Sequence, residues 1–147
     1  MSERMKLMIQ VLHVCGNSMG FDQLNETGWA MTYLVWDDTS KEAALIDPVY
    51  DFMDHYLEVL EKKGLTLVYA MATHTHADHI TACFSLKEKL GCSYVMWHST
   101  SCLNVSKYVD HGDTIKMGNV MFKFHHAPGH TNDSMLIETA THVMTGD

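Results

Sequence analysis

The sequence lacks several features that would define other classes of protein. None of its 147 residues lies in an apolar run of 18 or more, so no segment is long enough to cross a membrane as a helix. The first ten residues lack the apolar core and small-residue cleavage site of a secretory signal. Because 18 acidic residues outnumber 10 basic ones, the net charge of -8 argues against nucleic acid or an anionic membrane as a partner.

Cysteine is also scarce, which excludes a scaffold built on disulfides. The four cysteines form no C-x-x-C pair, and they are Cys15, Cys83, Cys92 and Cys102. We therefore expect reduced thiols and a cytoplasmic location, or the mitochondrial matrix if the source is eukaryotic. The chain is 46% hydrophobic and has only 2 prolines, a composition typical of one globular domain with a real core.

The apolar pattern predicts a layered α/β or α+β domain. Alternation or short apolar runs predict strands over 5–14, 30–36, 43–46, 65–72, 92–97 and 120–124, and a hairpin of 134–138 with 141–144. Helical spacing predicts helices over 51–63 and 78–90, each followed by a glycine. Residues 109–119 are expected to form a tight turn between strands, with Gly112 and Gly118 at positive φ.

Histidine is abundant, and the 11 histidines are not evenly spread. The segment THTHADH (73–79) directly follows a predicted strand, and the motifs APGHT and TGD follow two later strands. In α/β sheets, side chains at the carboxyl ends of strands meet in one crevice. Imidazole and carboxylate groups suit zinc, iron, nickel or copper, and they do not suit calcium. We therefore predict a metal site from His74, His76, Asp78, His79, His130 and Asp147.

Simpler interpretations apply to some of these residues and to the other histidines. Asp78 could cap the helix predicted at 78–90. His125 and His126 are interpreted as partly exposed residues at the end of a strand, although one of them could support the metal ligands. Surface or turn positions are expected for His13, His55, His98, His111 and His142.

The motifs THTHADH, APGHT and TGD resemble those of the metallo-β-lactamase superfamily, whose fold is an αββα sandwich with the metal at one edge. The segments ALIDPV (44–49), VYAMATHTHADHIT (68–81) and APGHTNDS (127–134) are similar to the persulfide dioxygenases within it. The segment HADHIT favours these dioxygenases over glyoxalase II. The sequence departs from the dioxygenase pattern at Ala82, where glycine is frequent, and at Asn132 and Asp133, where Pro-Gly is frequent.

Domains of this superfamily continue well past the TGD aspartate. The chain therefore resembles the N-terminal half of such a domain, and we expect a single, incomplete αββα sandwich over residues 1–147. Half a sandwich would leave one sheet face apolar and exposed, which favours a homo-oligomer.

The resemblance implies one Fe(II) per chain, held by His74, His130 and Asp147 as a facial triad of two histidines and one carboxylate. The implied substrates are O₂ and a thiol persulfide, glutathione persulfide first, with sulfite as the product. In this scheme the remaining candidates His76, Asp78 and His79 orient ligands and waters, as Asp47 does from its strand end.

Two alternatives remain open at the level of sequence. In a zinc-dependent thioester hydrolase of the glyoxalase II type, His74, His76 and His130 would hold one zinc ion. Asp78 and His79 would help to hold a second, bridged by Asp147, and the metals would activate a water molecule. The other alternative is an inactive half-domain that binds metal weakly.

Overall fold

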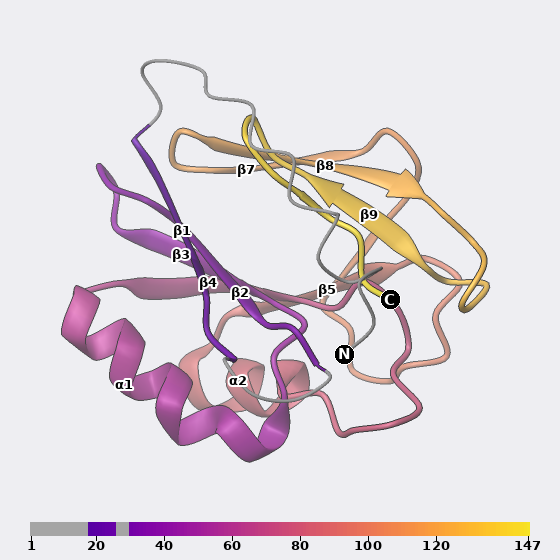
Figure 1. Ribbon diagram of the computed structural model, residues 1–147, viewed down its shortest axis with the longest axis horizontal. Coiled ribbons are helices and arrows are strands. Elements are labelled where there is room, and N and C mark those ends of the chain that lie inside the picture. The colour runs from indigo at the N-terminus through magenta and orange to yellow at the C-terminus, as the bar shows by residue number, and fades with distance from the viewer. Residues whose placement is uncertain (1–17, 26–29) are drawn as a thin grey trace.

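The computed structural model describes residues 18–25 and 30–147, which are arranged in three layers (Figure 1). Within these residues, six strands form one sheet in the order β1-β2-β3-β4-β5-β6, and four form a second in the order β10-β9-β8-β7. Helices α1 and α2 cover the outer face of the larger sheet.

The elements are short. The larger sheet contains β1 (Met19–Gln23), β2 (Tyr33–Asp37), β3 (Glu42–Ile46), β4 (Thr66–Met71), β5 (Ser93–Trp97) and β6 (Lys107–Val109). The smaller sheet contains β7 (Thr114–Met117), β8 (Val120–His126), β9 (Met135–Glu138) and β10 (Val143–Met144). The helices are α1 (Met53–Lys63), preceded by the 3-10 turn Tyr50–Phe52, and α2 (Cys83–Leu90).

The strand directions place several loops at one edge of the larger sheet. Strands β1, β2 and β3 pair antiparallel, whereas β3, β4, β5 and β6 pair parallel. Helices α1 and α2 lie in the crossovers from β3 to β4 and from β4 to β5. Because parallel strands end at the same edge, the segments that follow β3, β4 and β5 lie together there.

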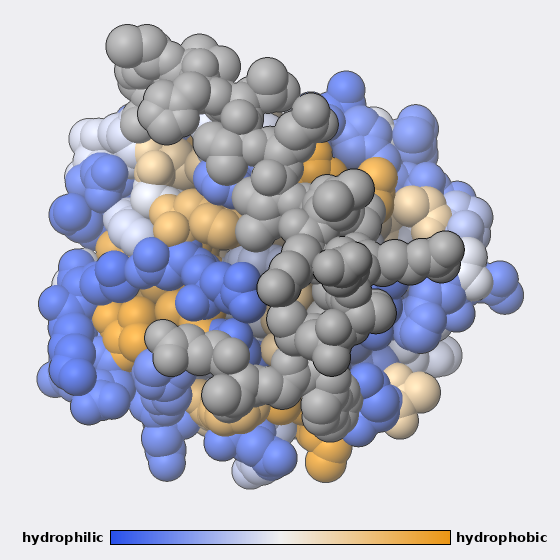
Figure 2. All heavy atoms as spheres, in the orientation of Figure 1, coloured by the Kyte–Doolittle hydropathy of each residue, from blue (hydrophilic) through white to orange (hydrophobic). Residues whose placement is uncertain are grey.

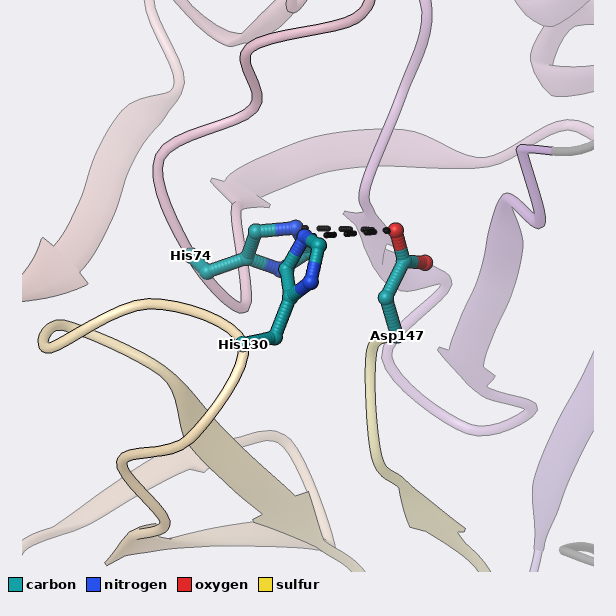
Figure 3. A group of neighbouring side chains, drawn as sticks. All are labelled: His74, His130 and Asp147. Atoms are coloured by element: carbon teal, nitrogen blue, oxygen red, sulfur yellow. Dashed lines mark ion pairs between the residues drawn. The ribbon is translucent and has the colours of Figure 1, made fainter.

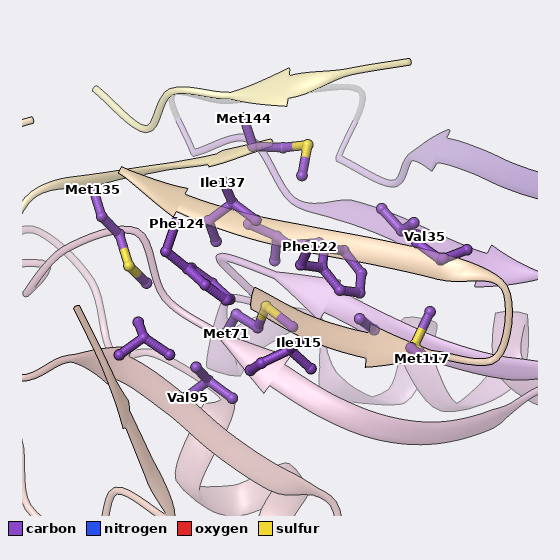
Figure 4. Packing of buried hydrophobic residues seen from close by; sticks show 14 of the residues in the cluster. Val35, Met71, Val95, Ile115, Met117, Phe122, Phe124, Met135, Ile137 and Met144 are labelled. Carbon is purple, nitrogen blue, oxygen red and sulfur yellow. The ribbon is translucent and has the colours of Figure 1, made fainter. Parts of the chain in front are cut away.

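One hydrophobic cluster fills the space between the two sheets (Figure 4). Strand β8 shows how the sequence produces it, since alternate residues of a strand face opposite sides. Val120, Phe122 and Phe124 are buried against the larger sheet, while Met121 and Lys123 face outward. Their partners across the interface include Val35, Ile46, Met71 and Val95.

A second cluster lies between the larger sheet and its helices. Tyr56 and Leu60 of α1 and Cys83 and Leu86 of α2 are buried there. The larger sheet is thus covered on both faces, which explains why the β4 sequence is an almost continuous apolar run. No helix in residues 18–25 and 30–147 combines the length and apolar character that a membrane span needs.

The predicted helix over 78–90 is wrong in its first turn, because α2 begins only at Cys83. The preceding residues are held out of a helix by long-range backbone hydrogen bonds, Tyr50 N–H to the carbonyl of Ile80 (2.9 Å) and Ala82 N–H to that of Pro48 (2.8 Å). Ile80 in this segment is 73% exposed. Asp78 therefore does not cap α2, whose N-cap residue is Ala82.

Other expected elements differ in smaller ways. Helix α1 ends at Lys63 and is followed by Gly64, as predicted, and this glycine has a φ of 64°. The segment 109–119 is more than a turn, since it contains β7, in which Ile115 and Met117 are buried. Strands β1 and β6 were not predicted, and the strand expected over 5–14 lies outside the described residues.

The outer face of the smaller sheet is mixed in character rather than uniformly apolar. In the described part of the chain no helix covers this face. It exposes Met121 and Val143, but also Lys116 and Lys123. In the view of Figure 2 the rim of the molecule is mainly hydrophilic, and apolar side chains show in patches nearer the middle.

Candidate metal centre

The six predicted ligands lie on three segments and form two groups. The first group, here called the triad, takes one residue from the loop after β4, one from the loop between β8 and β9, and one from the segment after β10. The second, here called the loop group, comes entirely from the loop after β4. The triad consists of His74, His130 and Asp147, and the loop group of His76, Asp78 and His79.

Within the triad, candidate ligand atoms face one another without hydrogen bonding (Figure 3). The Oδ2 atom of Asp147 is 3.9 Å from Nε2 of His74 and 3.7 Å from Nε2 of His130. The two imidazole rings are perpendicular, with centroids 4.9 Å apart. The side chain of His74 is 2% exposed and that of His130 is 53% exposed, so the triad is open to solvent on the His130 side.

A chain of hydrogen bonds fixes the tautomer of His74. The hydroxyl of Thr73 donates its only proton to Asp47 (2.8 Å). That hydroxyl must therefore accept the hydrogen bond that joins it to Nδ1 of His74 (2.9 Å), which places the ring proton on Nδ1. The lone pair of His74 is then on Nε2, a buried atom with no hydrogen-bond partner among the described residues.

Asp47 fixes the tautomer of His76 as well, but with the opposite result. A carboxylate accepts hydrogen bonds, so Nε2 of His76 donates to Oδ1 of Asp47 at 3.1 Å. The lone pair of His76 is therefore on Nδ1, which is also buried and unpartnered in the part that the structure describes. Asp47 itself is 5% exposed and has an unusual backbone, with φ of 53°. The expectation that this strand-end carboxylate supports the site agrees with these contacts.

Burial and neighbouring charges shift the pKa values of these two histidines in opposite directions. Burial lowers the pKa of His74, and the nearby imidazole of His76 lowers it further. Burial also disfavours the charged form of His76, but the hydrogen bond and charge of Asp47 outweigh it and raise the pKa of His76. The neutral imidazole that binds a metal is thus favoured at His74.

The triad fits a metal ion on two observations. Two ligand atoms that each lie about 2.0–2.2 Å from an ion are roughly 3–4 Å apart, which includes both separations measured to Asp147. In addition, an unpartnered buried nitrogen at His74 is costly by itself, and coordination would satisfy it. Two imidazoles and a carboxylate with one open side suit iron or zinc.

Two residues of the site were not recognised in the sequence. Asp133 is 6% exposed and binds the loop after β4, although it was noted only as a departure from a family pattern. Gly146 brings the chain close to His74: a Cβ atom there would be 2.6 Å from Oγ1 of Thr73 and 3.2 Å from Nδ1 of His74. The TGD motif was the only sequence signal for that glycine.

The other histidines lie elsewhere. His125 is 2.6 Å from Glu138, and His126 stacks on Trp97 with ring centroids 4.5 Å apart. The remaining described histidines are exposed or partly buried, in agreement with the sequence interpretation: His55, His98, His111 and His142. His13 lies outside the described residues.

The two sheets pack as a sandwich with helices on one outer face, and imidazole and carboxylate groups cluster at one edge. This combination defines a class of α/β proteins that bind a metal at that edge. Comparison with known families makes this specific, because the metallo-beta-lactamase superfamily matches residues 30–144. The chain belongs to the metallo-beta-lactamase superfamily.

Individual relatives fall into more than one branch. The human mitochondrial persulfide dioxygenase ETHE1 is 37% identical over 119 residues, which are 79% of this chain and 46% of that protein. A hydroxyacylglutathione hydrolase from a Bradyrhizobium strain is 36% identical over 69% of this chain and 40% of its own length. The crystal structure of ETHE1 from Myxococcus xanthus superimposes with a TM-score of 0.81 at 35% identity, covering 85% of this chain and 56% of that one. The chain thus spans about half the length of these relatives.

Proposed function

We propose that the protein is an iron-dependent persulfide dioxygenase, which oxidises a thiol persulfide with O₂ and water to the thiol and sulfite. Glutathione persulfide is the leading candidate substrate. The human relative at 37% identity is named for this activity and for a mitochondrial location. Its name supports the same activity for the present protein, and a reducing compartment such as the mitochondrion.

The observation that carries the proposal is the convergence of two histidines and one carboxylate at a single point. His74, His130 and Asp147 offer three ligand atoms within 4.8 Å of one another. Fe(II) held by these three residues would supply positions for a sulfur ligand and O₂. The overall reaction balances as RSSH + O₂ + H₂O → RSH + H₂SO₃, in which the terminal sulfur is oxidised and O₂ is reduced.

The residues around the triad prepare it for this role. Asp47 and Thr73 hold the ring of His74 so that its unprotonated nitrogen faces Asp147. Asp47 also holds His76 beside the triad, with the rings of His74 and His76 at a centroid distance of 4.1 Å. His76, Asp78 and His79 would then orient ligands and water beside the triad.

One observation favours a second candidate, a zinc-dependent thioester hydrolase. The loop group is itself compact enough to hold an ion, and the Nδ1 atom of His76 is buried without a partner in the described structure. Two zinc ions, one held by His74, His76 and His130 and the other by Asp78 and His79 with Asp147 as the bridge, would activate water for attack on a thioester carbonyl. The hydroxyacylglutathione hydrolase relative supports this alternative.

Metal content and oxygen uptake separate the two candidates. We expect about one iron per chain after purification from medium containing both metals, and O₂ consumption on an oxygen electrode in proportion to added glutathione persulfide. About two zinc ions per chain, with thiol release from a thioester and no O₂ uptake, would establish the hydrolase instead. A chain that binds neither metal would support the inactive half-domain.

A further inference from the structure

The carboxylate of Asp133 lies at the junction of the two loops that carry His74 and His130. It is 6% exposed. Both of its oxygens are 3.2 Å from the backbone N–H of Thr75, and the hydroxyl groups of Thr75 and Thr131 donate to it at 2.5 Å and 2.6 Å. Burial by itself raises the pKa of Asp133, but the hydrogen bonds from Thr131 and Thr75 outweigh it and lower that pKa.

These contacts join segments that are distant in sequence. Thr75 lies between His74 and His76, and Thr131 directly follows His130. Thr75 and Asp133 are 58 positions apart, so only the folded structure brings them together. Hydrogen bonds to an ionised carboxylate are stronger than those between neutral groups, which makes this a strong polar link between the two loops.

We infer that Asp133 is a positioning residue that holds the His130 loop against the His74 loop and thereby sets the spacing of the triad. A metal site needs its ligands within about 0.5 Å of their working positions. His74 and His130 lie in loops that follow strands of different sheets, so a contact between the loops is needed to fix their spacing. The inference rests on the proposed metal centre, but it does not require that the bound metal oxidise a persulfide.

The competing interpretation is that Asp133 only stabilises the fold, and Asp37 provides a matched control. Asp37 is a fully buried carboxylate that accepts hydrogen bonds from the backbone of Ser40 (3.0 Å) and the hydroxyl of Ser18 (3.0 Å). Asp37 is the last residue of β2. The site lies near the other end of this strand, where the first residue, Tyr33, is paired with Ile46. Both carboxylates are buried and hydrogen-bonded, and only Asp133 contacts the ligand loops.

The test is a Co(II) titration of the metal-free chain, followed through the visible absorption of the bound ion. We expect Asp133→Ala to weaken Co(II) binding by about 10-fold or more and to change the spectrum. Asp133→Asn should recover part of the affinity, because its one amide oxygen can still accept from one of the two threonine hydroxyls. Asp37→Ala should lower the melting temperature and leave the affinity and spectrum unchanged. Wild-type affinity and spectrum in Asp133→Ala, or an equal loss in Asp37→Ala, would overturn the inference.

A metal-free measurement keeps the inference testable whatever the metal chemistry proves to be. In hydrogen exchange of the apoprotein, Asp133→Ala should speed exchange in both loops, 73–79 and 128–134. If Asp133→Ala does not fold, Thr75→Val removes one donor and should affect the same two loops. Faster exchange confined to residues 128–134 would contradict the inference. A wild-type chain that binds Co(II) but shows no oxygen uptake would refute the proposed function and leave this inference standing.

Discussion

The triad and the loop group contain similar side chains but are built in different ways. The loop group spans residues 76–79, so a single loop conformation brings it together. The triad spans residues 74–147 and draws on loops from both sheets, so it exists only when the sandwich is assembled. Ligands of the same chemistry thus depend on local structure in one group and on tertiary structure in the other.

The largest expected effect is the loss of a triad ligand. We expect His130→Ala to weaken iron binding by more than about 100-fold, beyond the loss typical of residues that only support a ligand. Elemental analysis of the purified variant measures this loss. His55→Ala is the control, since His55 is exposed on α1 and should retain iron. Stoichiometric iron in His130→Ala would show that the triad is not the iron site.

The next effect concerns Asp47, which supports both groups. Asp47→Asn should weaken metal binding by about 10- to 100-fold, because an amide cannot accept hydrogen bonds from Thr73 and His76 at both of its polar atoms. Metal titration of the variant, beside the exposed control Asp54→Asn on α1, measures this effect. An unchanged affinity would mean that the tautomers of His74 and His76 are set by other contacts.

A smaller effect on iron is expected from the loop group. Under the dioxygenase proposal, His79→Ala should retain iron with an affinity about 10-fold below that of wild type, at the low end of the loss for a residue that only supports the ligands. The same variant should lose the second ion if the site instead holds two zinc ions. Metal content per chain distinguishes the cases, and a complete loss of iron would show that the two groups form one site.

The smallest effect is a pH dependence of stability through Asp133. The pKa of this carboxyl is lowered in the folded protein, so its ionised form stabilises the fold. That contribution is complete above the unfolded-state pKa of about 3.9 and is lost as the pH falls through the folded-state value. Urea unfolding of the metal-free protein should show wild type more stable than Asp133→Asn at pH near 6, and a difference that shrinks in acid. A constant difference would contradict this assignment.

The parts of the fold that follow from local periodicity were predictable from the sequence. Alternation identified β8, the long apolar run identified β4, and helical spacing ending in Gly64 identified α1. The three ligand loops were predictable because each follows such an element. The candidate ligands were therefore chosen without any knowledge of how they meet.

The features that were missed depend on long-range contacts. The delayed start of α2 results from hydrogen bonds to residues 48–50, which helical spacing does not register. The contact of Asp133 with Thr75 could not be predicted from the sequence either, because the packing of the two sheets brings these residues together. Strand β7 is only four residues long, too short for a periodic signal beside its turn.

The backbone of Asp47 restricts which amino acids this position can hold. With φ of 53°, the position favours glycine, asparagine or aspartate. Its side chain must also accept three hydrogen bonds, from the backbone and hydroxyl of Thr73 and from His76, which requires a carboxylate of short reach. Glycine meets only the backbone requirement and glutamate only the requirement for charge. Among the twenty standard residues, aspartate alone satisfies both, so a saturation library at position 47 should return a single fully functional residue.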